Sequence, residues 1–170
     1  MRKTLEVIGV GLLGLLAWIT YWAINGPNPL PRRIPTHFAA SGQPDAWGSQ
    51  SSLWLLPIVA GAVYLLFTVV SQFPASFNFP VRVTPVNRPR LEALTLQMMS
   101  WIKVEVVSLL LFIQWSILQS VRNGKGTLSP MMVPLFLVAV FATVGVHLVA
   151  IFRAAKVAAG PQSLPGLKAK

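Results

Sequence analysis

Two groups of residues in this sequence have side chains that could carry acid–base or ligand chemistry. His37 and Asp45 lie in a polar stretch, IPTHFAASGQPDAWGSQ, between two long apolar runs. Lys103, Glu105 and His147 lie inside apolar runs, where ionisable side chains are costly and usually functional. A His–carboxylate pair can exchange protons or, with further ligands, hold a metal ion. The elements that position each group decide which chemistry is available.

Four apolar segments are long enough for membrane-spanning helices, which need about 20 residues each. The chain is 54% hydrophobic and only 11% charged, and soluble domains carry about 25% charged residues. The predicted spans cover residues 5–24, 53–73, 93–118 and 131–152. We therefore predict an all-α membrane protein. It has a four-transmembrane-helix bundle over residues 1–153, a Pro/Gly-rich extracytoplasmic loop lobe between helices 1 and 2, and a cytoplasmic tail at 154–170.

Lysine and arginine predict the direction in which the chain crosses the bilayer. Nine of them flank the termini and the second loop, namely Arg2, Lys3, Arg82, Arg88, Arg90, Arg153, Lys156, Lys168 and Lys170. Four lie in the first and third loops, namely Arg32, Arg33, Arg122 and Lys125. The positive-inside rule places both termini in the cytoplasm and loop 25–52 outside the inner membrane of a bacterium.

Composition narrows the function further. The net charge of +10 is explained by flanking charges that orient helices, so we expect no nucleic-acid partner. The chain has no cysteine, which excludes disulfides, zinc–thiolate sites and cysteine nucleophiles. The run GVGLLG at 9–14 matches a dinucleotide-binding pattern, but it lies within an apolar span and lacks the acidic residue that follows the motif. Its small residues instead predict close packing of a neighbouring helix.

Proline and glycine shape the loop between the first two spans. Its prolines at 27, 29, 31 and 35 favour extended backbone, and SGQPD predicts consecutive tight turns at 41–45. Asp45, Ser51 or Ser52 would cap the helix that follows. The larger side chains would pack beneath the lobe or lie at headgroup level, namely Ile34, Phe38 and Trp47.

His37 and Asp45 leave three interpretations open. They could brace the turn by a structural hydrogen bond, recognise a ligand or partner, or contribute to a metal or catalytic site. A metal ion would need three or four ligands, and only these two are evident. We therefore expect no resident cofactor or metal.

The same loop resembles a known family. LPRRIPTHFAASGQPDAWGSQ, residues 30–50, is similar to the pattern L-P-x-x-I-P-x-H-[FWY]-x-x-x-G-x-P-D-x-[WYF]-G-S-K of the bacterial membrane family called domain of unknown function 1648. The matching residues are Leu30, Pro31, Ile34, Pro35, His37, Phe38, Gly42, Pro44, Asp45, Trp47, Gly48 and Ser49. Gln50 departs from the lysine that ends the pattern, so no role of that charge carries over.

Residues 77–103 also resemble the second-loop segment of that family. The resemblance implies a multi-pass fold and a first loop with a role of its own, and it implies no reaction. Some relatives with a similar domain are toxin-immunity and signal proteins of the Sdp type.

The third predicted span carries the most costly residues. Lys103 and Glu105 are about 200° apart around a helix, so they need different partners. Glu105 could pair with His147, or with Lys103 of a second copy, as a proton-relay or substrate site. The alternatives are a structural polar clamp and a Lys103 side chain that reaches back to the interface. Glu92, Lys103 and Gln114 are spaced by eleven residues and should share one face.

Three classes of function follow from these residues. The first is a non-enzymatic protein whose loop 30–50 recognises or scaffolds a peptide, a toxin or another membrane protein, as an immunity, signalling or accessory subunit. The second is a small proton-coupled transporter or transport subunit that uses Glu105, Lys103 and His147. An enzyme is the least favoured class, because no nucleophile–base arrangement is present. The lipid bilayer is the remaining expected partner, and a second copy of the chain is a further candidate.

Overall fold

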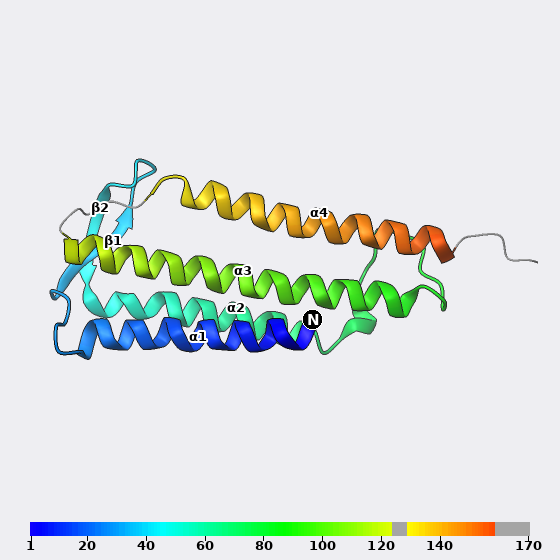
Figure 1. Ribbon diagram of the computed structural model, residues 1–170, viewed down its shortest axis with the longest axis horizontal. Coiled ribbons are helices and arrows are strands. Elements are labelled where there is room, and N and C mark those ends of the chain that lie inside the picture. Colours follow the sequence, from blue (N-terminus) through cyan, green and yellow to red (C-terminus); the bar gives the residue numbers. More distant parts are fainter. Residues whose placement is uncertain (124–128, 159–170) are drawn as a thin grey trace, which may run out of the picture.

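The computed structural model describes residues 1–123 and 129–158. Four helices dominate it, namely α1 (Arg2–Asn25), α2 (Leu55–Val70), α3 (Arg88–Asn123) and α4 (Met132–Ala158). They run side by side along the long axis of the molecule (Figure 1). All four are long and apolar enough to cross a membrane, the second together with the short helix η1 (Gln50–Trp54) that precedes it. The prediction of a helical protein with four helices long and apolar enough to span a membrane is confirmed.

The helix α3 is the centre of the assembly. The helices α1, α2 and α4 each pack on it, and α4 makes no comparable contact with α1 or α2 in the described part of the chain. Figure 1 shows α1 and α2 on one side of α3 and α4 on the other. At 1.5 Å per residue, the 36 residues of α3 span about 54 Å, which exceeds the roughly 30 Å of a bilayer core.

Two strands form a hairpin in the predicted loop lobe. The strands β1 (Arg33–Phe38) and β2 (Pro44–Ser49) pair antiparallel, with Ile34 opposite Gly48. Extended backbone was expected before the turn, but the turn comes earlier than the expected 41–45, so Pro44 and Asp45 already belong to β2. The cap of η1 also differs from the expected residues, because Ser49 is its N-cap and accepts a hydrogen bond from the Ser51 amide.

The outer surfaces of the helices are strongly apolar. Leu135 and Phe141 of α4 are more than two-thirds exposed, and α1 and α2 expose similar side chains. Such continuous apolar surfaces on a helical protein are typical of contact with lipid tails. The buried interior is correspondingly small and is divided into three clusters along α3.

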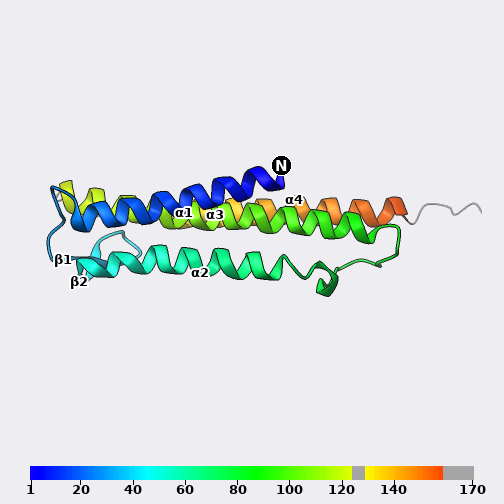
Figure 2. The same cartoon turned by 90° about the horizontal axis from the view of Figure 1, so that it is seen from below.

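One end of α3 projects beyond the start of α1. Both views show α3 continuing well past the N-terminus of α1 (Figures 1 and 2). There the loop after α2 folds back and places Phe79 and Val81 against a cluster of Leu91, Leu94 and Ile151. The loop contains a short helix η2 (Pro74–Ser76) and no strand. The helix α4 reaches Ala158, so the predicted tail begins as helix, and residues 159–170 lie outside the described residues.

Candidate functional site

The β1–β2 hairpin is anchored to the bundle through one face. Ile34 is 1% exposed and lies in a cluster with Leu53 of η1 and Ile117 of α3. Phe38 packs against the same cluster at the far end of β1. The Leu30 amide donates to the Ala23 carbonyl at 2.9 Å, which ties the start of the loop to the end of α1. The hairpin is therefore a fixed structure on the ends of α1 and α3.

Two glycines are required by the backbone of the hairpin. Gly42 has φ 81°, a left-handed conformation that side chains other than glycine rarely adopt, and its amide donates to the Ala39 carbonyl to close the turn. A Cβ added to Gly48 would lie 2.8 Å from Cγ2 of Thr36 on the opposite strand. These contacts explain why glycines at 42 and 48 accompany the polar residues of the motif.

His37 and Asp45 meet across the hairpin. Nδ1 of His37 is hydrogen-bonded to Oδ1 of Asp45, as the pair predicted from the sequence requires. The two side chains are 69% and 47% exposed, and Trp47 on β2 is 51% exposed. Exposed ion pairs contribute about 0–1 kcal/mol to stability. The pair and the Trp47 ring are thus both exposed on the hairpin.

Gln50 lies where the resemblance pattern has lysine. Its backbone amide donates to the Arg32 carbonyl at 2.9 Å. When the nitrogen and oxygen of the Gln50 side-chain amide exchange places, the amide nitrogen donates to the carbonyls of Leu30 and Pro31 at 3.0 and 3.2 Å. A neutral donor is enough to hydrogen-bond these carbonyls, so the start of the hairpin is held without a positive charge at this position.

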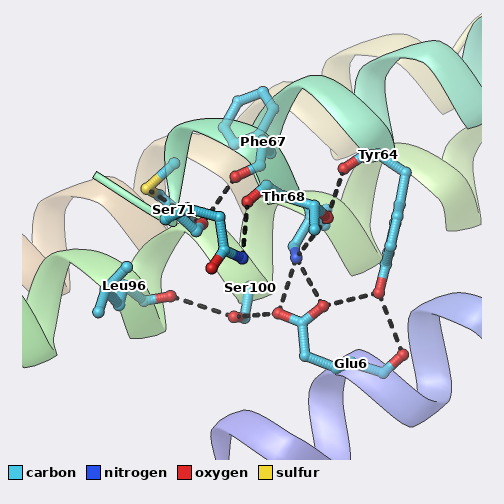
Figure 3. A network of polar contacts seen from close by, with 10 residues as sticks. Glu6, Tyr64, Phe67, Thr68, Ser71, Leu96 and Ser100 are labelled. Carbon is cyan, nitrogen blue, oxygen red and sulfur yellow. Dashed lines mark hydrogen bonds and ion pairs between the residues drawn. The ribbon is translucent and has the colours of Figure 1, made fainter. Parts of the chain in front are cut away.

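A second polar site, the clamp, joins α1, α2 and α3 inside the spanning region (Figure 3). Its centre is an ion pair in which Nζ of Lys103 lies 2.7 and 2.6 Å from the two carboxylate oxygens of Glu6. Lys103 is only 2% exposed. Ser100 donates to Glu6 Oε1 at 2.7 Å, and Tyr64 donates to Glu6 Oε2 at 2.7 Å. Both oxygens of the carboxylate therefore have two donors each.

The helix α2 completes the clamp around the ammonium group. Nζ of Lys103 donates to Thr68 Oγ1 at 3.3 Å and lies 4.6 Å from the centre of the Tyr64 ring, a distance at which a cation is attracted to an aromatic face. A Cβ on Gly9 would lie 2.7 Å from Cε2 of Tyr64. The predicted packing role of the 9–14 glycines therefore holds at Gly9, while Gly11 and Gly14 have no neighbour within 4 Å.

The clamp changes the interpretation of Lys103. Its side chain points to Glu6 of the same chain, and it neither reaches back to the interface nor awaits a second copy. Glu6 was not among the residues selected from the sequence. The sequence signal that could have revealed Glu6 was a lone carboxylate near the start of an apolar span, with a lysine elsewhere in the bundle to pair with it.

Lys103 and Gln114 do share a face of α3, since Gln114 donates to Thr20 of α1 at 2.8 Å. Glu92 on the same spacing pairs instead with Arg88 at the surface.

Glu105 lies on the opposite side of α3, as the helical spacing predicts. Its Oε1 accepts a hydrogen bond from the Thr143 hydroxyl of α4, and its Oε2 is buried with no hydrogen-bond partner in the described part of the chain. His147 lies one turn further along α4, and its Nδ1 is 2.8 Å from the Thr143 carbonyl, to which it donates. The expected direct pair between Glu105 and His147 is not formed, because Thr143 lies between the two side chains and bonds to both. They line one cavity of about 450 Å³.

No group of three or more His, Asp or Glu side chains within residues 1–123 and 129–158 could hold a metal ion. The polar side chains thus fall into three sites that lie along or at the end of α3. The hairpin is exposed, the Glu6–Lys103 clamp is saturated with hydrogen bonds, and Glu105 is partly satisfied. The first and third have groups that are not fully hydrogen-bonded within the chain.

Comparison with known proteins gives limited matches. The chain is 34% identical over 96 residues to a protein of Archaeoglobus fulgidus that is itself described as uncharacterized. That alignment covers 52% of this chain and 49% of the relative, so the chain matches about half the length of the relative. No solved structure matches. The model of the domain of unknown function DUF1648 matches residues 11–61, which run from α1 through the hairpin into α2. This segment, which holds the His37–Asp45 pair, belongs to the DUF1648 family.

Proposed function

We propose that the β1–β2 hairpin is a recognition lobe and that the chain is a non-catalytic membrane protein. Its partner would be another membrane protein or a secreted peptide or toxin, in an immunity, signalling or accessory role. The observation that supports this is the division of the hairpin into two faces. Ile34 and Phe38 fix one face to the bundle, and His37, Asp45 and Trp47 are presented on the exposed side.

Stability alone does not account for the exposed residues. An ion pair as exposed as His37–Asp45 adds little to folding, and a half-exposed tryptophan leaves much of its apolar ring unburied. Tryptophan is enriched among residues that carry binding energy at protein interfaces. A hydrogen-bonded polar pair and an exposed ring on backbone that is already ordered can bind a partner with a small cost in conformational entropy.

The test is a tagged pull-down from native membranes in mild detergent, with bound proteins identified by mass spectrometry. We expect a stoichiometric partner with the wild type that is lost with H37A/D45A. The matched control is R88A/E92A, which removes an exposed ion pair at the other end of the molecule. A partner retained by H37A/D45A, or lost equally in both double variants, would contradict the recognition role.

The proposed orientation places both termini in the cytoplasm and the hairpin outside the plasma membrane. The absence of cysteine makes this simple to test with single cysteines at Ser41 in the hairpin turn and Ser76 in η2, both exposed. An impermeant maleimide should label S41C in intact cells and S76C only after permeabilisation. The reverse pattern would invert the topology and place the recognition lobe inside the cell.

A second candidate function is transport, and one observation favours it. Glu105 has a buried, unpartnered oxygen in a cavity that it shares with His147, and ionisable groups within membrane helices commonly mark substrate or proton paths. Lys103 contributes less to this candidate than the sequence suggested, because Glu6 holds it in the clamp. Proteoliposomes that take up a substrate with the wild type and not with E105Q would support transport over recognition.

A further inference from the structure

Two cavities meet at Glu105 in the groove between α3 and α4. The larger, about 520 Å³, lies beside the first half of α4 and is walled mainly by apolar side chains such as Phe112 and Leu135. The smaller, about 450 Å³, lies beside the second half of α4 and includes His147. Glu105 and Trp101 line both cavities. Each volume is within the roughly 300–1,000 Å³ that small-molecule sites occupy.

The Glu105 carboxyl has no cationic partner within the described residues. Thr143 supplies one hydrogen bond to Oε1, and Oε2 has no partner. No salt bridge among residues 1–123 and 129–158 includes Glu105, and Lys103 is engaged by Glu6 on the other side of α3. A neutral acyl chain in the groove offers this carboxyl neither a hydrogen bond nor a counter-charge. A cation offers a counter-charge to its ionised form.

The surroundings of Oε2 indicate which kind of cation fits. Because this oxygen is covered, an ammonium group could not hydrogen-bond to it unless the side chain moved. A cation whose charge is spread over apolar groups needs no hydrogen bond, and its attraction to a carboxylate acts through space in a low-dielectric wall. Trp101, Phe112 and Phe136 in the wall add aromatic faces that attract cations. We infer that the α3–α4 groove binds a lipophilic cation, with Glu105 as its counter-charge.

This site is separate from the hairpin and does not depend on the recognition role. It rests on the same carboxylate as the transport candidate and supplies that candidate with a substrate class. Experiments can exclude the cation-binding site and the transport function independently of each other. Binding of a lipophilic cation without uptake into proteoliposomes would keep the site and remove transport, and uptake of another solute through Glu105 without cation binding would do the reverse.

The experiment measures binding of radiolabelled tetraphenylphosphonium to the purified chain in detergent by equilibrium dialysis, with empty micelles subtracted. We expect E105Q to weaken binding at least tenfold and E105D to retain it. A139F should also weaken binding at least tenfold, because Ala139 lines the larger cavity and a phenyl ring would fill it. The matched control is E92Q on the same helix, whose carboxylate pairs with Arg88, and it should bind as the wild type does.

Each variant is first checked for a wild-type elution profile and melting temperature. If E105Q does not fold, the inference is tested with the other two variants. E105D keeps a carboxylate and should bind, whereas A139F keeps Glu105 but fills the groove and should not. Equal affinity of the wild type and E105Q would overturn the inference, as would unchanged binding by A139F. No binding by the wild type above empty micelles would overturn it as well.

Discussion

The ionisable side chains on the two sides of α3 differ in how many hydrogen-bond partners they have. Toward α1 and α2, Lys103 and Glu6 form an ion pair whose carboxylate oxygens receive four donor contacts from three side chains. Toward α4, Glu105 has one hydroxyl donor and one oxygen with no partner in the described residues. Only two positions separate Lys103 and Glu105 along the helix, so the difference comes from the neighbouring helices and not from depth along α3.

This contrast separates a residue that holds the fold from one that is available to a ligand. A buried ionic group with all its hydrogen bonds made has nothing left to offer and loses stability if any partner is removed. A buried group that is partly satisfied lowers stability where it lies, and such groups are commonly explained by function. The clamp therefore holds the fold, and we propose that the Glu105 side is the one that meets a ligand.

The largest effect is expected when the clamp loses its carboxylate. E6Q leaves the buried ammonium of Lys103 without a counter-charge, and breaking a buried pair in this way costs about 3 kcal/mol. Reversible unfolding of the purified protein in mixed micelles measures the loss. The control E92Q removes the carboxylate of an exposed pair and should cost about 0.5 kcal/mol, and E6Q/K103M should recover most of the loss. A cost for E6Q no larger than for E92Q would erase the contrast between the two sides.

A smaller loss is expected from crowding the clamp without touching its charges. G9A places a Cβ 2.7 Å from Cε2 of Tyr64, so the ring must move and its bond to Glu6 weakens. Such overpacking costs about 1–2 kcal/mol. G11A is the matched control on the same helix, because no atom lies within 4 Å of its Cβ. The same unfolding assay should find G11A as stable as the wild type, and equal losses in both variants would place the effect in α1 itself.

The smallest effect on stability is expected at Glu105. In E105Q the Thr143 hydroxyl still has an oxygen to which it can donate, and the amide cannot carry a charge. We expect the free energy of unfolding to change by no more than about 1 kcal/mol. The unfolding series that includes E6Q and G9A tests the comparison directly. A loss for E105Q as large as that for E6Q would assign both sides of α3 to structure.

Several features of the molecule follow from sequence patterns alone. Apolar length is enough to locate the four spans, because a bilayer imposes it. Helical spacing is enough to place Lys103 and Glu105 on opposite faces of α3. The residues of the hairpin motif are enough to suggest the His37–Asp45 pair, because a turn between them brings them together.

The partners across helices were harder to predict. Lys103 meets Glu6 because α3 projects past α1, so the first turn of one helix lies at the fifth turn of the other. Sequence fixes the position of a residue along its own helix, and it does not fix how far neighbouring helices are shifted along their axes. The place of Thr143 between Glu105 and His147 depends in the same way on the rotation of α4 against α3.

The length of α3 has a mechanical consequence. It is one uninterrupted helix that packs against the hairpin strand β1 near one end and against η2 near the other. The clamp fixes it to α1 and α2 at Lys103, between these two ends. A force on the hairpin would therefore act on α3 and be resisted by the clamp and by the packing of α3 against α1, α2 and α4.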